Sequence, residues 1–131
     1  MELPAHIRDA IIEHAREEDP NECCGILAAA DGKIVKQYRI TNAEKSPYRY
    51  QLDGREYVAA LREIDDNGWE LAVIYHSHTH SPAYPSATDI RLVTWPDAYY
   101  LLVSLEDKAN PVMRVFRIVE SEVTEEPIEE G

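Results

Sequence analysis

A run of apolar residues that ends in two histidines, two positions apart, constrains this chain more than any other segment. Leu71-Ala72-Val73-Ile74 is typical of a buried strand, and His76 and His78 follow it closely. Side chains at positions i and i+2 of a strand point to the same face, so both imidazoles can reach one metal ion. The segment therefore predicts a buried strand that ends at a metal site.

Asp89 completes a set of three metal ligands. It stands eleven residues after His78, at the predicted first turn of a short helix, and a Pro-rich loop between them allows the chain to fold back. Two imidazole nitrogens and one carboxylate oxygen leave a coordination position open for water. That is the pattern of catalytic sites, whereas structural zinc sites are closed by four ligands.

A metal hydrolase also needs a base that takes a proton from water and gives it to the leaving amine. Glu22 is the candidate, because it stands in P-N-E-C-C-G-I-L at the entry to a predicted strand that can hold a carboxylate rigidly. Most glutamates are simply solvated, and this chain has 25 acidic residues. The choice of Glu22 therefore depends on a family resemblance.

These residues resemble the JAMM (MPN+) metalloproteases, whose signature is a glutamate at an early strand, then H-x-H, seven residues, and S-x-x-D. Glu22, His76, His78, Ser86 and Asp89 match it position by position. The resemblance implies that the two histidines and the aspartate bind one zinc ion, that the glutamate is the general acid/base, and that the serine helps to stabilise the tetrahedral intermediate. It also implies an α/β fold with a single domain, in which helices flank a mixed, curved sheet, an architecture that is JAMM/MPN-like and cytidine-deaminase-like.

The resemblance covers nearly the whole chain and points to the bacterial cysteine-releasing branch of the family. The matching segments are N-A-E-K-S-P-Y-R-Y-Q-L-D, Y-H-S-H-T, A-Y-P-S-A-T-D and F-R-I-V. This implies a zinc-dependent peptidase of cysteine biosynthesis, which hydrolyses an amide bond at the Gly-Gly C-terminus of a ubiquitin-like sulfur-carrier protein and releases cysteine. Two positions depart from the branch: many relatives have proline at the place of Thr79, and His80 is an additional histidine.

Two other classes of function stay open. One is a general JAMM isopeptidase or small-peptide hydrolase, and the other is a binding module that keeps the metal only for structure. The complete set of base and ligands disfavours the module, because a module can lose its base without losing its fold. A nucleophilic cysteine is also disfavoured, because the metal site already supplies a nucleophile.

Several of these residues also have a purely structural interpretation. Ser86 and Asp89 form an S-x-x-D pattern before an apolar run, which is typical of a helix capping box, and both roles are compatible. His80 extends the motif to H-x-H-x-H, so it either replaces Asp89 in an all-histidine site or lines the cleft. His6 and His14 lie on the first predicted helix, and we assign them to the surface or its rim, without a function.

Cys23 and Cys24 are the only cysteines. Adjacent cysteines do not form an ordinary disulfide without strain, and a lone pair does not make a zinc site. We predict free thiols in a reducing compartment, with strand alternation turning one inward and the other outward.

Length and composition predict one domain, residues 1–119, with an acidic tail at 120–131 that is either an edge strand or disordered. A net charge of -12 disfavours nucleic acid and anionic membranes as partners, although salt adaptation produces the same excess of acid. No apolar run approaches the roughly 18 residues of a membrane span, and no secretory pattern is present. We therefore expect a cytoplasmic protein and leave the formation of a homodimer open.

Periodicity predicts the order α-β-β-α-β-α-β-β. The three helices are expected from Pro4 to before Pro20, from Asp53 with Glu56 as a capping box to near Gly68, and from Ala87 to about Trp95. The further strands are expected at 25–30, 34–40, 99–105 and 112–119, and the first two flank the hairpin signal Asp31-Gly32.

A flexible protein tail needs a groove beside the metal. The expected walls are the loop of Ser46, Pro47, Tyr48 and Tyr50 and the segment 81–84.

Overall fold

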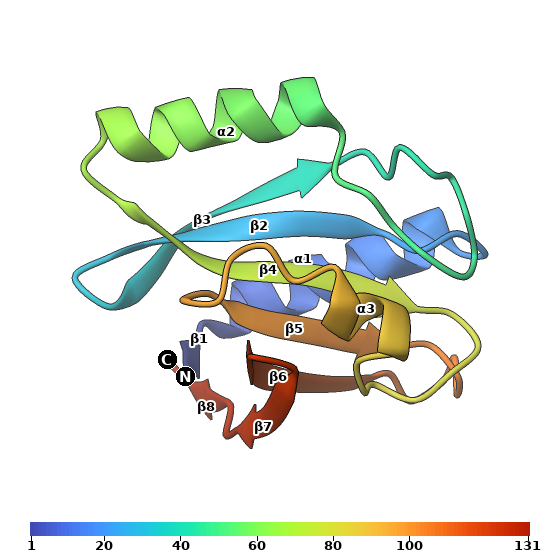
Figure 1. Cartoon of the computed structure of the whole chain (residues 1–131). Coiled ribbons are helices and arrows are strands. Elements are labelled where there is room, and N and C mark those ends of the chain that lie inside the picture. The colour runs from blue at the N-terminus through green and yellow to red at the C-terminus, as the bar shows by residue number, and fades with distance from the viewer.

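The centre of the molecule is a six-stranded sheet with the strand order β3-β2-β4-β5-β6-β7 (Figure 1). The computed structural model describes the whole chain, residues 1–131. Neighbours β4 and β5 are parallel, and all other neighbouring strands of this sheet are antiparallel. The strands are β2 Cys24–Ala30, β3 Lys33–Ile40, β4 Glu70–His78, β5 Tyr99–Ser104, β6 Val112–Val119 and β7 Glu122–Glu126.

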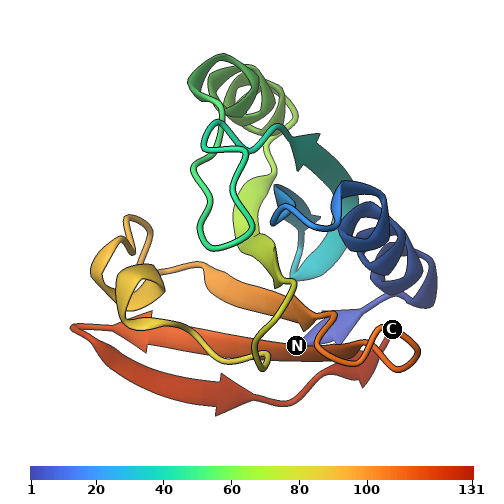
Figure 2. The same cartoon turned by 90° about the vertical axis from the view of Figure 1, so that its right-hand side faces the viewer.

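Helices cover both faces of this sheet. α1 (Ala5–Glu18) packs on one face, and α2 (Gly54–Asp66) and the short α3 (Ala87–Arg91) lie on the other. Figure 2 shows the sheet turning between β2–β3 and β5–β7. The predicted α/β architecture with a mixed, curved sheet between helices is therefore confirmed. None of the helices is both long and apolar enough to span a bilayer.

The two chain ends meet beside the main sheet. β1 (Glu2–Leu3) pairs in parallel with β8 (Glu129–Glu130), which places the termini side by side (Figure 1). Residues 122–126 form β7 on the sheet edge next to β6. The tail therefore contributes one edge strand and one half of a two-stranded pair.

Strand β4 is buried on both faces, which explains its nearly continuous apolar sequence. Val73 and Tyr75 belong to the core that packs against α1, together with Ile11. Ile74 belongs to the core on the opposite face, together with Ile64 of α2. Because side chains alternate along the strand, His76 and His78 follow Ile74 on the α2 side.

The turn chemistry read from the sequence is largely confirmed. Asp31 and Gly32 both have positive φ, 51° and 78°, as a tight hairpin turn between β2 and β3 requires. Asp53 caps α2 by accepting from the backbone N–H of Glu56 at 3.3 Å. The expected capping box is incomplete, however, because the Glu56 carboxylate accepts from Thr41 N–H instead.

The third helix is shorter than predicted. It was expected to run from Ala87 to about Trp95, but it ends at Arg91. The Tyr100 hydroxyl accepts from the N–H of Trp95 and donates to its carbonyl, both at 3.2 Å, which removes these backbone groups from helical pairing. Trp95 also precedes Pro96, and that position disfavours the helical conformation.

Two predictions about burial are wrong, because helices cover both faces at the start of β2 and because His14 of α1 points toward the sheet. Cys23 and Cys24 are both buried, on opposite faces, although one was expected to point outward. His14 was assigned to the surface but is only 5% exposed, and its Nδ1 lies 2.7 Å from the Tyr75 hydroxyl. His6 is exposed, as predicted.

Candidate metal centre

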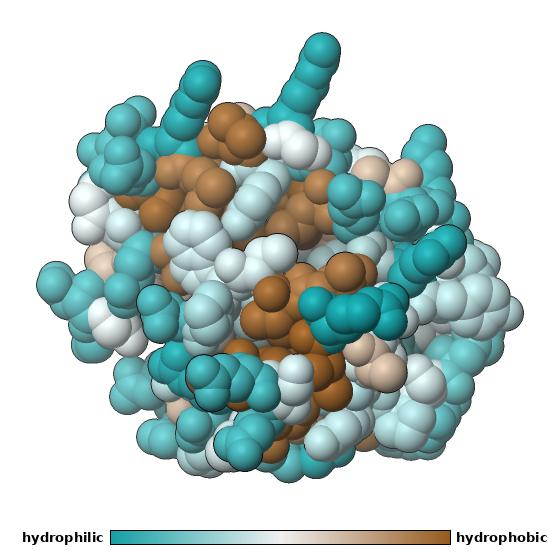
Figure 3. Space-filling model, in the orientation of Figure 1, coloured by the Kyte–Doolittle hydropathy of each residue, from teal (hydrophilic) through white to brown (hydrophobic).

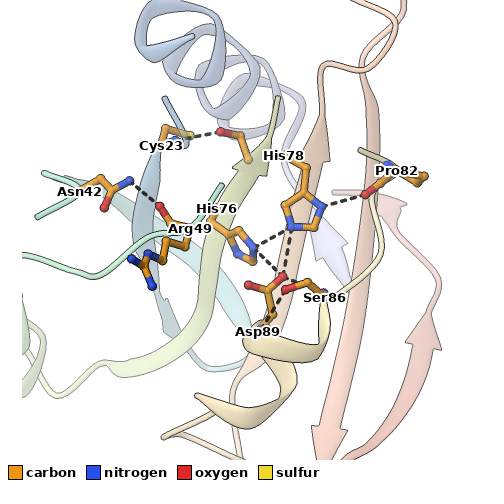
Figure 4. A network of polar contacts seen from close by, with 9 residues as sticks. Cys23, Asn42, Arg49, His76, His78, Pro82, Ser86 and Asp89 are labelled. Carbon is orange, nitrogen blue, oxygen red and sulfur yellow. Dashed lines mark hydrogen bonds and ion pairs between the residues drawn. The ribbon is translucent and has the colours of Figure 1, made fainter. Parts of the chain in front are cut away.

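The three predicted metal ligands meet at the end of β4. Nε2 of His76 and Nε2 of His78 lie 3.3 Å apart. Oδ2 of Asp89, from α3, lies 3.2 Å from the first nitrogen and 3.1 Å from the second (Figure 4). Both histidines are buried, and the Asp89 side chain is 11% exposed. The prediction that the histidines share one side of the strand is confirmed.

These separations fit a tetrahedral cation. Zinc bonds of about 2.0–2.1 Å to nitrogen and oxygen imply about 3.3–3.4 Å between neighbouring ligand atoms of a tetrahedron. The separations of 3.1, 3.2 and 3.3 Å come within a few tenths of an ångström of that value. Two imidazoles and one carboxylate also match the ligand types of catalytic zinc, although other divalent metals accept the same donors. The residues present therefore fit the implied ion.

The two histidine rings are held in different ways. Nδ1 of His78 lies 2.8 Å from the carbonyl oxygen of Pro82, which can only accept, so Nδ1 donates and Nε2 keeps its lone pair for a metal. Nδ1 of His76 is buried without a hydrogen-bond partner. Its ring instead stacks on Tyr50, with a centroid separation of 4.2 Å and an interplanar angle of 24°.

Asp89 is held by the capping box that the sequence indicated. Ser86 Oγ accepts from Asp89 N–H at 3.0 Å, and Asp89 Oδ2 accepts from Ser86 N–H at 2.9 Å. The same Oδ2 faces both histidines, so the structural and the ligand geometry occur together. The capping box thus fixes the carboxylate on a helix of only one turn.

Electrostatics favour the ligand forms of Asp89 and His76. Burial alone would raise the pKa of Asp89, but hydrogen bonds with His76 and His78 outweigh it and hold the pKa well below the ordinary value. Burial lowers the pKa of His76. Burial acts in the same direction on His78, but the Asp89 carboxylate and the Pro82 carbonyl raise its pKa. A charged carboxylate and a neutral His76 are the forms that bind a metal.

Glu22 lies beside this cluster with an unpaired carboxyl oxygen. It is 3% exposed, and its Oε1 has no hydrogen-bond partner. Burial raises its pKa to about 8, while His78 opposes this shift and Asp89 adds to it. A buried carboxyl group with such a pKa beside a metal-ligand set is suited to proton transfer near neutral pH.

No pattern in the sequence indicated the residue that holds Glu22 in place. Asn42 is 5% exposed, and its Nδ2 donates to the Glu22 carbonyl at 3.1 Å, while Glu22 N–H donates to the carbonyl of Ser46 at 2.9 Å. Figure 4 shows Asn42 also bonded to the backbone of Arg49. Its Oδ1 accepts from Glu44 N–H and Gln51 N–H. An asparagine in a loop is an ordinary turn residue, so no sequence signal marked this role.

The remaining histidine and the cysteines lie outside the ligand set. His80 is exposed, is not part of the three-residue cluster, and has its Nδ1 2.8 Å from Thr79 Oγ1, so the all-histidine alternative is not supported. Burial raises the pKa of Cys23 to about 12 and also raises that of Cys24. Both thiols are therefore protonated and buried, which disfavours a nucleophilic cysteine.

A groove of about 460 Å³ opens beside Asp89. Most of its lining comes from three segments, namely the loop after β3, helix α2, and the segment from α3 to β5. Of the residues expected to form the walls of a substrate groove, Tyr50 lines this one, whereas Ser46, Pro47, Tyr48 and the segment 81–84 do not. A larger and more open depression of about 630 Å³ lies along α1 and contains none of the site residues.

The chain is similar to known proteins over most of its length. Residues 4–119 match the family described as prokaryotic homologs of the JAB domain. The chain is 45% identical over 128 residues to the CysO-cysteine peptidase of Mycobacterium tuberculosis, covering 96% of this chain and 88% of the relative. It is 38% identical over 111 residues to the desampylase of Haloferax volcanii, covering 79% of this chain and 80% of the relative.

Solved structures resemble the chain as well. A solution structure from Desulfitobacterium hafniense matches with a TM-score of 0.88 and 35% identity, covering 98% of this chain and 91% of that one. A crystal structure of a JAB1/MPN domain protein from Archaeoglobus fulgidus matches with a TM-score of 0.66 and 18% identity, over 99% and 100% of the two chains. The second likeness supports the fold.

Proposed function

The chain belongs to the family of prokaryotic JAB-domain proteins, and we propose that it is a zinc-dependent peptidase that releases cysteine from the C-terminus of a ubiquitin-like sulfur-carrier protein. The observation that carries the proposal is the set of three ligand atoms separated by 3.1–3.3 Å beside the buried, unpaired carboxyl group of Glu22. The substrate is inferred from the 45% identity to a protein named CysO-cysteine peptidase.

Each site residue has a part in the proposed hydrolysis. His76, His78 and Asp89 would hold zinc, which when bound acts as a Lewis acid and makes water a better nucleophile. Glu22 takes a proton from the attacking water and gives it to the leaving amine, for which a pKa near neutrality is well matched. The hydroxyl hydrogen of Ser86 is free to donate to the oxyanion, because its oxygen already accepts from Asp89 N–H.

The test uses a carrier protein that bears a C-terminal Gly-Gly-Cys sequence. We expect zinc-loaded wild type to remove the mass of one cysteine residue, as read by intact mass spectrometry. Glu22→Gln should bind zinc normally but lose about 10²-fold to 10⁴-fold in rate, because general acid–base catalysis contributes about that much. Glu18→Gln is the matched control, since Glu18 is an exposed glutamate at the end of α1.

The outcomes separate the parts of this proposal. Turnover that is unchanged in Glu22→Gln removes Glu22 from the mechanism. Absence of cleavage by zinc-loaded wild type would contradict the proposed substrate.

A general isopeptidase is the second candidate, favoured by the 38% identity to a desampylase. The two candidates differ in the leaving group, which is a free amino acid in one case and a lysine side chain of a protein in the other. Cleavage of a lysine-linked carrier conjugate in preference to the C-terminal cysteine adduct would favour this second function.

A further inference from the structure

The groove beside Asp89 has a charge pattern that differs from the rest of the molecule. The chain as a whole carries a net charge of -12. The groove, in contrast, is lined by as many basic side chains, Arg49 and Arg91, as acidic ones, Glu44 and Asp89. Neither arginine side chain makes a hydrogen bond or an ion pair within the protein. Two unpaired guanidinium groups in an acidic protein leave a place for an anion.

The two arginines come from different segments of the groove lining, the loop after β3 and α3. Arg49 precedes Tyr50, whose ring stacks on the ligand His76, and Figure 4 shows Arg49 on the loop beside that histidine. Arg91 is the last residue of α3, and Asp89 lies on the same short helix. Arg91 is thus two residues from the ligand Asp89, and Arg49 is next to the tyrosine that contacts the ligand His76.

The rest of the groove is mostly apolar. Leu52, Tyr57, Ile74 and Tyr100 line it, and its volume of about 460 Å³ is that of a site for a small molecule. Figure 3 shows this face of the molecule, with hydrophobic side chains gathered over α2 and around α3. A small apolar group with one anionic end matches this lining.

We propose that Arg49 and Arg91 bind the free C-terminal carboxylate of the residue that leaves, and thereby select substrates whose chain ends at that residue. This rests on the proposed peptidase function and specifies its substrate. Hydrolysis adds OH to the acyl carbon and H to the departing nitrogen, and no other reactant is needed. In the departing residue, only the Cα separates the carboxylate from the nitrogen at which the bond is cleaved. A guanidinium that binds this carboxylate in a bidentate way therefore also orients the scissile bond.

The test compares two adducts that differ only in this carboxylate. Ligation of a carrier thioester with cysteine or with cysteinamide gives the same protein with a free or an amidated C-terminus. For zinc-loaded wild type we expect kcat/KM to be at least about 10-fold higher for the free acid, as a hydrogen bond to a charged group is worth roughly that factor. Arg49→Gln combined with Arg91→Gln should bring the ratio of the two rates close to 1.

Arg62→Gln is the matched control, because Arg62 is an exposed arginine of α2 that has no ion pair and does not line the groove. It should keep the wild-type preference. Zinc content and melting temperature, measured for every variant, separate loss of the metal or of the fold from loss of recognition.

Three results overturn this proposal. They are equal rates of wild type on the two adducts, a preference that survives in the double variant, and an equal loss of preference in Arg62→Gln. Failure of wild type to cleave either adduct is a different result, because it removes the proposed function itself.

Discussion

Strand β4 carries a buried polar cluster on each of its faces, and the two clusters differ in how completely their hydrogen bonds are satisfied. On the α1 side, the Tyr75 hydroxyl lies 2.7 Å from His14 Nδ1 and accepts from Gln37 Nε2 at 3.1 Å. On the α2 side, Glu22 Oε1 and His76 Nδ1 are buried without a partner. One face of the strand is therefore a closed network, and the other is open.

The difference separates stability from chemistry. A buried polar atom without a partner costs about 1–3 kcal/mol, so a fold retains such atoms where something else uses them. The Tyr75 ring also leaves room only for glycine at position 25 of the neighbouring strand β2, because a Cβ there would lie 2.4 Å from the ring. We infer that Tyr75 serves the fold, whereas His76, the next residue, serves the reaction.

The largest effect is expected on the open face, from loss of a ligand. His78→Ala should abolish hydrolysis and lower zinc affinity by at least 100-fold, because loss of a ligand exceeds the roughly 10–100-fold cost of losing an outer contact. Elemental analysis of the purified protein and competition with a zinc chelator measure this. His80→Ala is the control, since His80 lies outside the ligand cluster and should keep its zinc. Full zinc occupancy in His78→Ala would contradict the assignment of the ligands.

The next effect concerns the stability of zinc-free protein. Burial raises the pKa of Glu22 from 4.5 to about 8, so the native state keeps this proton to a higher pH than the unfolded chain does. The contribution of Glu22 to stability is therefore full below pH 4.5 and is lost as the pH rises to about 8. Glutamine has no proton to lose, so Glu22→Gln should be more stable than wild type by a few kcal/mol at pH 9 and by less at pH 6.

Urea denaturation with chelator present at the two pH values checks this sign. Glu18→Gln is again the control, because Glu18 is exposed at the end of α1 and its replacement should leave the stability close to that of wild type. An advantage of Glu22→Gln that shrinks as the pH rises would mean that the carboxyl group is not held in its neutral form.

Much of the open face could be predicted from the sequence because its signals are local or carried by a motif. The spacing of His76 and His78 places two rings on one side of any strand, and S-x-x-D fixes Asp89 at a helix start. The partners of Glu22 could not be predicted in this way. Asn42 is 20 residues away from Glu22 in the chain, and its role depends on how the loop after β3 folds back.

The closed face was mispredicted for a related reason. His14 lies 61 residues from Tyr75, and nothing in the helical pattern of α1 indicates that a histidine faces the sheet. The prediction for the cysteines failed because strand alternation gives the direction of a side chain but not whether a helix covers that face. On the other face, the end of α3 depended on the Tyr100 hydroxyl, which bonds the backbone of Trp95 only five residues earlier, a side-chain contact that helical periodicity does not show.

The smallest effect should appear on the closed face and in stability alone. Tyr75→Phe leaves His14 Nδ1 and the Gln37 amide without their partner, so we expect a loss of about 1–3 kcal/mol in the free energy of unfolding. Burial lowers the pKa of His14 to about 4, so the His14 ring is neutral at pH 7. Protonation of the ring therefore does not compensate for the lost hydrogen bond at that pH. Zinc content and kcat/KM should match those of wild type. Tyr48→Phe is the control, because Tyr48 is 80% exposed and its loss of a hydroxyl should change neither quantity. A fall in kcat/KM of Tyr75→Phe at full zinc occupancy would mean that the two faces of β4 are coupled, and the separation between them would then be wrong.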